Sequence, residues 1–196
     1  LQVGVPCIIS GPSGIGKTAL CKGVVSSAQI KALFKDGVLW FDASRSTLSR
    51  LCDDIARKLG RPGIPQIEDP GDRIKALREL LAHQPRLVVL DNVQDPDLVT
   101  RFSQRVSKHL LATTEEIFHL QSATHVQLGP LTERAAEACF RHHAGKVTGT
   151  EAQIARVCRL LQYNPQALAL AAAYLRTENL RLSHLIQDLE SYDMRV

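Results

Sequence analysis

Apolar residues follow two different spacings along this chain, and the pattern changes near Gly129. Before that point, short apolar runs alternate with stretches in which apolar residues recur every three or four positions, and these spacings are typical of strands and helices respectively. The runs predict strands over residues 5–10, 37–42, 86–91, 108–113 and 124–128. Strands that alternate with helices predict an α/β domain with a parallel sheet covered by helices on both faces.

After Pro130 the helical spacing continues without further strands. Helices are expected from Lys17 onward and over residues 47–59, 72–82, 133–143, 151–161, 165–176 and 182–189. The segment 61–70 contains three prolines and one glycine, which predict a loop. We therefore expect a three-layer domain over residues 1–129 and a small all-α helical subdomain over residues 130–196.

A glycine-rich turn joins the first expected strand to the first expected helix. It reads Gly-Pro-Ser-Gly-Ile-Gly-Lys-Thr and fits the phosphate-loop pattern G-x-x-x-x-G-K-[ST] completely. Glycines let backbone N–H groups converge on phosphates, and the following helix directs its positive end at them. The motif predicts a P-loop NTPase whose nucleotide contacts come from Gly11, Pro12, Ser13, Gly14, Ile15, Gly16, Lys17, Thr18 and Ala19.

Three residues are candidates for catalysis: Lys17, Asp91 and Asn92. Lys17 would place a positive charge on the outer phosphates, while Thr18 and Asp91 would hold Mg²⁺, Asp91 through a water. The alternative for Asp91 is a capping role at the end of its strand. Asn92 stands where many related ATPases have a second carboxylate, and an amide is a poor proton acceptor, so slow hydrolysis is predicted. Asp95 is a substitute base to be considered.

Hydroxyl groups end the strand expected near residue 110. Thr113 or Thr114 could hydrogen-bond the terminal phosphate or the attacking water, and Thr114 is included among the nucleotide-binding candidates. Ordinary strand-end threonines are the alternative.

Charge, cysteine content and hydropathy indicate which partners and which compartment to expect. The net charge is only +4 and the basic residues are spread along the chain, so a nucleic-acid partner is not expected. The five cysteines match no zinc or disulfide spacing, which favours thiols in a reducing compartment and a cytoplasmic location. The sequence has no apolar stretch of membrane-spanning length and no signal peptide, so no membrane partner is expected. It begins without Met and looks like a piece of a longer protein.

Several motifs in order resemble the NB-ARC family of signal-transduction ATPases with numerous domains (STAND), which includes plant disease-resistance proteins and the apoptotic protease-activating factor. Besides the phosphate loop, the resemblance is carried by residues 34–42 (FKDGVLWFD), 87–93 (LVVLDNV), 110–114 (LLATT), 128–132 (LGPLT) and 164–170 (NPQALAL).

The resemblance implies a switch operated by ADP and ATP with Mg²⁺. ADP would hold a closed, autoinhibited form, and ATP would favour an open form that self-associates through this domain. Effector and sensor domains would lie elsewhere in the protein, in defence or cell-death signalling. The resemblance also implies that Pro165 lies beside the base and ribose of the nucleotide, and that ATP is preferred over GTP.

The chain departs from the family pattern at three positions. Asn164 replaces the usual Gly, Asn92 replaces the second acid, and Glu115 stands where many members place an Arg that senses the terminal phosphate. Two other functions therefore stay open. One is an interaction scaffold that binds nucleotide without hydrolysing it, and the other is an AAA+ or origin-recognition type ATPase acting on DNA, against which the segment 164–170 argues.

Overall fold

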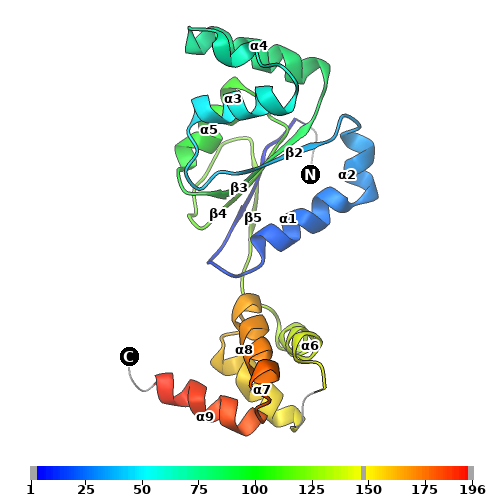
Figure 1. Ribbon diagram of the computed structural model, residues 1–196, viewed down its shortest axis with the longest axis vertical. Helices are drawn as coiled ribbons and strands as arrows, with labels where there is room; N and C mark the ends of the chain where they lie inside the picture. Colours follow the sequence, from blue (N-terminus) through cyan, green and yellow to red (C-terminus); the bar gives the residue numbers. More distant parts are fainter. Residues whose placement is uncertain (1–3, 147–148, 194–196) are drawn as a thin grey trace. The chain divides into compact units, whose positions relative to one another are not determined.

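The computed structural model describes residues 4–146 and 149–193, which form two compact units. The first, here the sheet unit, comprises Leu1–Gly11 and Lys17–Leu128. The second, here the helical unit, comprises Pro12–Gly16 and Gly129–Val196, so the residues of the phosphate loop group with the helices. Figure 1 shows the elements of both units.

The described residues of the sheet unit form a five-stranded sheet in the order β2-β3-β4-β1-β5, and every neighbouring pair is parallel. The strands are β1 (Cys7–Ser10), β2 (Val38–Asp42), β3 (Leu87–Val93), β4 (Leu110–Thr114) and β5 (Thr124–Gln127). The predicted parallel sheet is confirmed. β3 differs from the prediction because it continues past Asp91 to Val93, with a register shift against β4 between Leu90 and Val93.

Helices cover both faces of this sheet, as predicted (Figure 1). They are α1 (Lys17–Ser26), α2 (Ala28–Leu33), α3 (Leu48–Lys58), α4 (Pro70–His83) and α5 (Pro96–Arg105). Alternate residues of β3 divide between the two cores: Leu87 and Val89 pack with α1 and α2, whereas Val88 and Leu90 pack with α3, α4 and α5. Strands buried on both faces explain the near-continuous apolar runs in the sequence.

Local capping explains where the helices differ from the expected ranges. α4 begins at Pro70 because Asp69 accepts a hydrogen bond from the Asp72 N–H at 2.8 Å, so the predicted loop ends one residue earlier and contains a short 3₁₀ turn, Ile64–Gln66. The sequence analysis missed α5, although Asp95 followed by Pro96 is a typical helix start.

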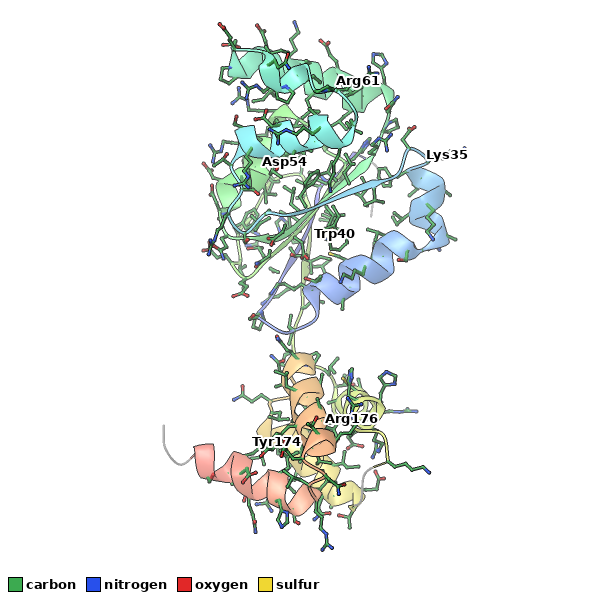
Figure 2. All side chains as sticks on the ribbon, viewed as in Figure 1. Lys35, Trp40, Asp54, Arg61, Tyr174 and Arg176 are labelled. Carbon is green, nitrogen blue, oxygen red and sulfur yellow. The ribbon has the colours of Figure 1, made fainter. Side chains whose placement is uncertain are left out.

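The outer strand β2 is covered at one point by a lysine from α3. The Lys58 ammonium donates a hydrogen bond to the Trp40 carbonyl at 2.8 Å and lies 4.3 Å from the centre of the Phe41 ring. Trp40 itself packs against the core formed with α1 and α2, and it is labelled in Figure 2.

The helical unit contains α6 (Glu133–Ala144), α7 (Glu151–Leu160), α8 (Pro165–Thr177) and α9 (Leu182–Asp193). Their buried faces form a separate core that includes Phe140, Val157 and Leu168. Thr132 caps α6, Thr150 begins α7 with a capping box, and Asn164 caps α8. None of the described helices combines the length and hydropathy needed to cross a membrane.

Candidate nucleotide-binding site

The phosphate loop and the start of α1 have the backbone that the motif predicts. Gly14 and Gly16 have φ values of +72° and +100°, which L-residues with side chains rarely adopt. Lys17 is the first residue of α1 and is buried, and its ammonium donates to the Gly11 carbonyl at 2.8 Å. The ammonium is therefore held at the first glycine of the motif, and Lys17 lies at the positive end of a helix.

The two predicted magnesium ligands lie together in the sheet unit. The Thr18 Oγ1 atom is 3.0 Å from both Oδ1 and Oδ2 of Asp91, although the residues are 73 positions apart in the sequence. Both supply oxygen, the ligand type that Mg²⁺ prefers, and Mg²⁺ usually completes its shell with phosphate oxygens and water. No group of three or more His, Cys, Asp or Glu residues suited to a metal occurs in the part of the chain that the structure describes. The pair thus fits an ion shared with a nucleotide, whose role would be to neutralise charge on the phosphates.

A third hydroxyl group contacts the Asp91 carboxylate. Thr113 on β4 donates to Asp91 Oδ1 at 2.6 Å and accepts the backbone N–H of Asn92 at 2.7 Å. Thr114, the other candidate, is fully buried, and its hydroxyl accepts the Glu116 N–H at 3.1 Å. The structure therefore brings Thr113 to the carboxylate, and a nucleotide contact of Thr114 stays a prediction.

Asn92 and Asp95, the two candidates for activating water, lie in different surroundings. Asn92 is exposed and has a φ of +62°, within the irregular part of β3. Asp95 caps α5 through the Asp97 N–H at 3.0 Å and forms an ion pair with Arg101 at 3.3 Å, and its role as a substitute base stays a prediction. Glu115 is exposed.

Cys21 lies on α1 and is fully buried. Burial, together with the smaller effects of the Asp91 charge and the neighbouring Cys7, raises the pKa of this thiol to about 12. Because the thiolate is the reactive form of cysteine, this residue stays a neutral thiol at ordinary pH. Its role is to fill the core under the site.

Within the helical unit, the N-terminus of α8 contacts the residues of the phosphate loop. The Asn164 Oδ1 atom accepts the N–H groups of Gln166 and Ala167, which caps the helix, while its Nδ2 atom donates to the Ser13 carbonyl at 3.2 Å. The Gln166 N–H also lies 3.2 Å from the Gly14 carbonyl. The sequence analysis missed these contacts because it treated Asn164 only as a tolerated replacement for glycine. Pro165 begins α8, and its contact with a base stays a prediction.

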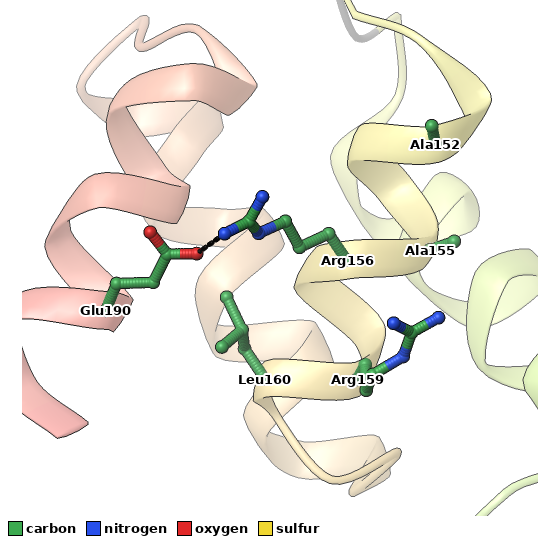
Figure 3. A pocket seen from close by; sticks show the side chains of 6 residues that line it. All are labelled: Ala152, Ala155, Arg156, Arg159, Leu160 and Glu190. Carbon is green, nitrogen blue, oxygen red and sulfur yellow. Dashed lines mark ion pairs between the residues drawn. The ribbon is translucent and has the colours of Figure 1, made fainter.

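The helical unit also has a pocket of about 610 Å³ between α7 and α9, across which Arg156 pairs with Glu190 (Figure 3). It contains none of the predicted site residues.

A family model described as the AAA domain matches residues 5–129. The chain belongs to the AAA domain family. The match includes the phosphate loop, Asp91 and both threonines of β4, so the predicted P-loop ATPase domain is confirmed. No curated protein matches the chain.

Solved structures of several P-loop ATPases resemble the fold of the chain. The Aeropyrum pernix ORC2 protein with ADPNP and ADP has a TM-score of 0.61 at 15% identity, covering 95% of this chain and 62% of that one. The Aeropyrum pernix ORC1 protein in complex with DNA has a TM-score of 0.63 at 17% identity, covering 96% and 59%. A STAND protein with a tetratricopeptide repeat sensor from Pyrococcus horikoshii has a TM-score of 0.56 at 16% identity, covering 82% and 26%.

These comparisons confirm the fold and support the broader assignment as a P-loop ATPase domain. Both a STAND protein and origin-recognition proteins share the architecture, so the finer resemblance to NB-ARC proteins stays a prediction. The expectation that nucleic acid is not a partner finds no support, since one of the similar proteins was solved with DNA. The chain spans less than two thirds of the length of the first of these proteins.

Proposed function

We propose that this AAA domain binds ATP and ADP with Mg²⁺ and acts as the nucleotide-operated switch of a larger signalling ATPase. The observation that carries the proposal is the contact of Thr18 with Asp91, next to a lysine whose ammonium donates to the Gly11 carbonyl. Lys17 and Thr18 of α1 and Asp91 of β3 are the three residues that would contact a metal–triphosphate complex.

The proposed switch depends on contacts that ATP makes and ADP does not. A ligand shifts a conformational equilibrium only by its different affinity for the two states. The γ-phosphate is the part that distinguishes ATP from ADP, and it would lie near Lys17 and the ends of β3 and β4. The order of motifs through residues 164–170 favours the NB-ARC kind of switch, with self-association in the ATP form and, by that resemblance, a role in defence or cell-death signalling.

Turnover in this proposal resets the switch slowly. Asn92 supplies an amide where a second carboxylate would polarise water, and Asp95 is held by the start of α5 and by Arg101. A general base near the attacking water typically contributes about 10²- to 10⁴-fold to the rate. We therefore propose a rate of ATP hydrolysis far below that of a motor ATPase.

The likeness to origin-recognition proteins favours a second function, an ATPase that acts on DNA. The two functions differ in salt dependence, because a protein that binds DNA displaces counterions from the phosphates, and that release is less favourable when the salt concentration is high. DNA affinity measured between 50 and 200 mM salt, with and without ATP, would support the second function if it is tight and falls steeply. Self-association that requires ATP and occurs without DNA would support the switch.

The first test of the site is Lys17→Ala, with Lys22→Ala as its matched control because Lys22 is an exposed lysine on the same helix. The purified proteins are denatured and the released nucleotide is identified by chromatography, and ATP–Mg²⁺ is then titrated into nucleotide-free protein. We expect the Lys17 variant to bind at least about tenfold more weakly, since it loses a charge-assisted contact to the phosphates, whereas the control binds as the parent does. Equal affinity of all three proteins would show that the loop is not the phosphate site.

A further inference from the structure

Two threonine hydroxyls from different elements hold the carboxylate of Asp91. Thr18 lies 3.0 Å from each carboxylate oxygen, and Thr113 lies 2.6 Å from Oδ1. Thr18 is expected to turn its oxygen toward the metal when magnesium and nucleotide bind. Thr113 is then the side chain that keeps the carboxylate in its orientation.

The Thr113 hydroxyl accepts one hydrogen bond and donates another. Its oxygen receives the Asn92 N–H at 2.7 Å, and its single hydrogen is directed to Asp91 Oδ1. The side chain is 1% exposed, so water does not compete for either bond. A hydrogen bond from a hydroxyl to a carboxylate is charge-assisted and short, as observed here.

The Asn92 N–H reaches Thr113 because β3 is irregular at this position. The register with β4 shifts between Leu90 and Val93, and Asn92 has a φ of +62°. In a regular parallel ladder the strand N–H groups bond carbonyls of the neighbouring strands, whereas here the N–H bonds a side chain. Asparagine is among the few residues with a side chain that adopt this backbone region readily.

We propose that Thr113 is a positioning residue for the magnesium-holding carboxylate, and that the left-handed backbone of Asn92 directs its hydroxyl. This inference rests on the proposed nucleotide site. It gives Asn92 a role that does not depend on proton transfer by its side chain. Groups that orient the ligands of a metal typically contribute about 10- to 100-fold to metal affinity, which sets the size of the expected effect.

The variant Thr113→Val tests this role, because it removes the hydroxyl and nearly keeps the shape of the side chain. ADP and ATP are titrated calorimetrically into each protein, once with excess EDTA and once across a series of MgCl₂ concentrations. We expect the Mg²⁺ concentration that gives half of the metal-dependent gain in affinity to rise about 10- to 100-fold. Affinity for ADP in EDTA should stay the same, since ADP has no terminal phosphate for Thr113 to contact.

Two further variants separate positioning from general damage. Thr113→Ser keeps the hydroxyl and should restore the magnesium dependence of the parent. Thr124→Val makes the same chemical change at an exposed position of β5 and should have no effect. If Thr113→Val does not fold, Asn92→Val takes its place, because a β-branched residue is strained at this φ and should displace the N–H that directs the hydroxyl.

Each outcome decides between the two proposals. A higher Mg²⁺ requirement in Thr113→Val or Asn92→Val supports the positioning role when Thr113→Ser keeps the magnesium dependence of the parent. Unchanged magnesium dependence in a folded variant would overturn it and leave the nucleotide site intact. A parent protein that binds neither nucleotide with or without Mg²⁺ would instead overturn the proposed function, and with it this inference.

Discussion

The sheet unit and the helical unit bury their hydrophobic residues in different ways. Strands β1 and β4 of the sheet unit are buried at every position, because helices cover both faces of the sheet. Each helix of the helical unit buries one face only, and on α8 the side chains of Leu170 and Tyr174 are 64% and 47% exposed. The AAA family model ends at residue 129, so it covers the strands and leaves out α6 to α9.

The difference determines how each unit places polar side chains. In the sheet unit, parallel register sets the site, since the ends of β3 and β4 bring Asp91 and Thr113 together across neighbouring strands. In the helical unit, helix capping places the polar side chains, and Asn164 accepts hydrogen bonds from the first turn of α8. The placement of Asp91 and Thr113 thus depends on the pairing of strands, whereas the side chain of Asn164 is placed mainly by the hydrogen bonds that cap its own helix.

Removing one phenylalanine from each core is the strongest test of whether the units are separate. Phe102 and Phe140 are fully buried in the two different cores, and Phe→Ala in a core typically costs about 3–5 kcal/mol. The only tryptophan of the chain, Trp40, is in the sheet unit, so its fluorescence reports that unit, while circular dichroism reports all helices.

We expect Phe140→Ala to lower the unfolding midpoint seen by circular dichroism and to leave the Trp40 transition in place. Phe102→Ala should shift the Trp40 transition. Two variants that move both signals equally would show that the units unfold as one.

Substitutions of Asn164 should have a smaller effect, confined to the helical unit. Asn164→Ala removes the cap of α8, and the loss of such a cap costs about 1 kcal/mol. Asn164→Asp keeps the accepting oxygen and removes the amide that donates to Ser13, so denaturant unfolding followed by circular dichroism should stay within a few tenths of a kcal/mol of the parent. If the aspartate variant is as unstable as the alanine variant, the bond to Ser13 matters more than the cap.

Thiol reactivity should differ between the units without any change in stability. Burial raises the pKa of Cys21 to about 12 and those of Cys52 and Cys158 to about 11, and all three are fully buried. A higher pKa leaves less thiolate near pH 8. Cys139 is partly exposed, so a thiol-reactive dye should label the helical unit first.

The labelling is followed by absorbance in native buffer and again in denaturant. Cys139→Ser should remove the first phase, and all remaining thiols should react only after unfolding. Rapid native labelling of a variant that lacks Cys139 would contradict the burial of the other four.

The sequence predicted most of the fold because periodic burial leaves a visible pattern. The five strands and the helices of the second unit lie close to the expected ranges, since apolar runs and capping residues are local signals. The helix α5 was missed although its start, Asp95 followed by Pro96, and its buried residues Leu98, Val99 and Phe102 are local signals that the sequence contains. The extension of β3 to Val93 could not be predicted, because it depends on a backbone irregularity and on the neighbouring strand.

The site was predicted in part. The phosphate loop, Thr18 and Asp91 follow a motif with fixed spacing, and the contact between the last two is observed. Which of two adjacent threonines meets the carboxylate depends on strand register, and successive residues of a strand point to opposite faces. The sequence offered both threonines as contacts of the terminal phosphate or the attacking water and did not predict that Thr113 meets Asp91, which the structure shows.

Lys58 of α3, which contacts the outer strand β2, bears on whether that edge of the sheet can pair with another chain. An outer strand presents unpaired backbone groups that can template pairing with another chain, and charged side chains there discourage it. In β2 the Trp40 carbonyl is already occupied by the Lys58 ammonium, which is also stacked on Phe41. Lys58 thus occupies one of the backbone acceptors on the open edge of β2 and places a positive charge there, which disfavours pairing of this strand with another chain.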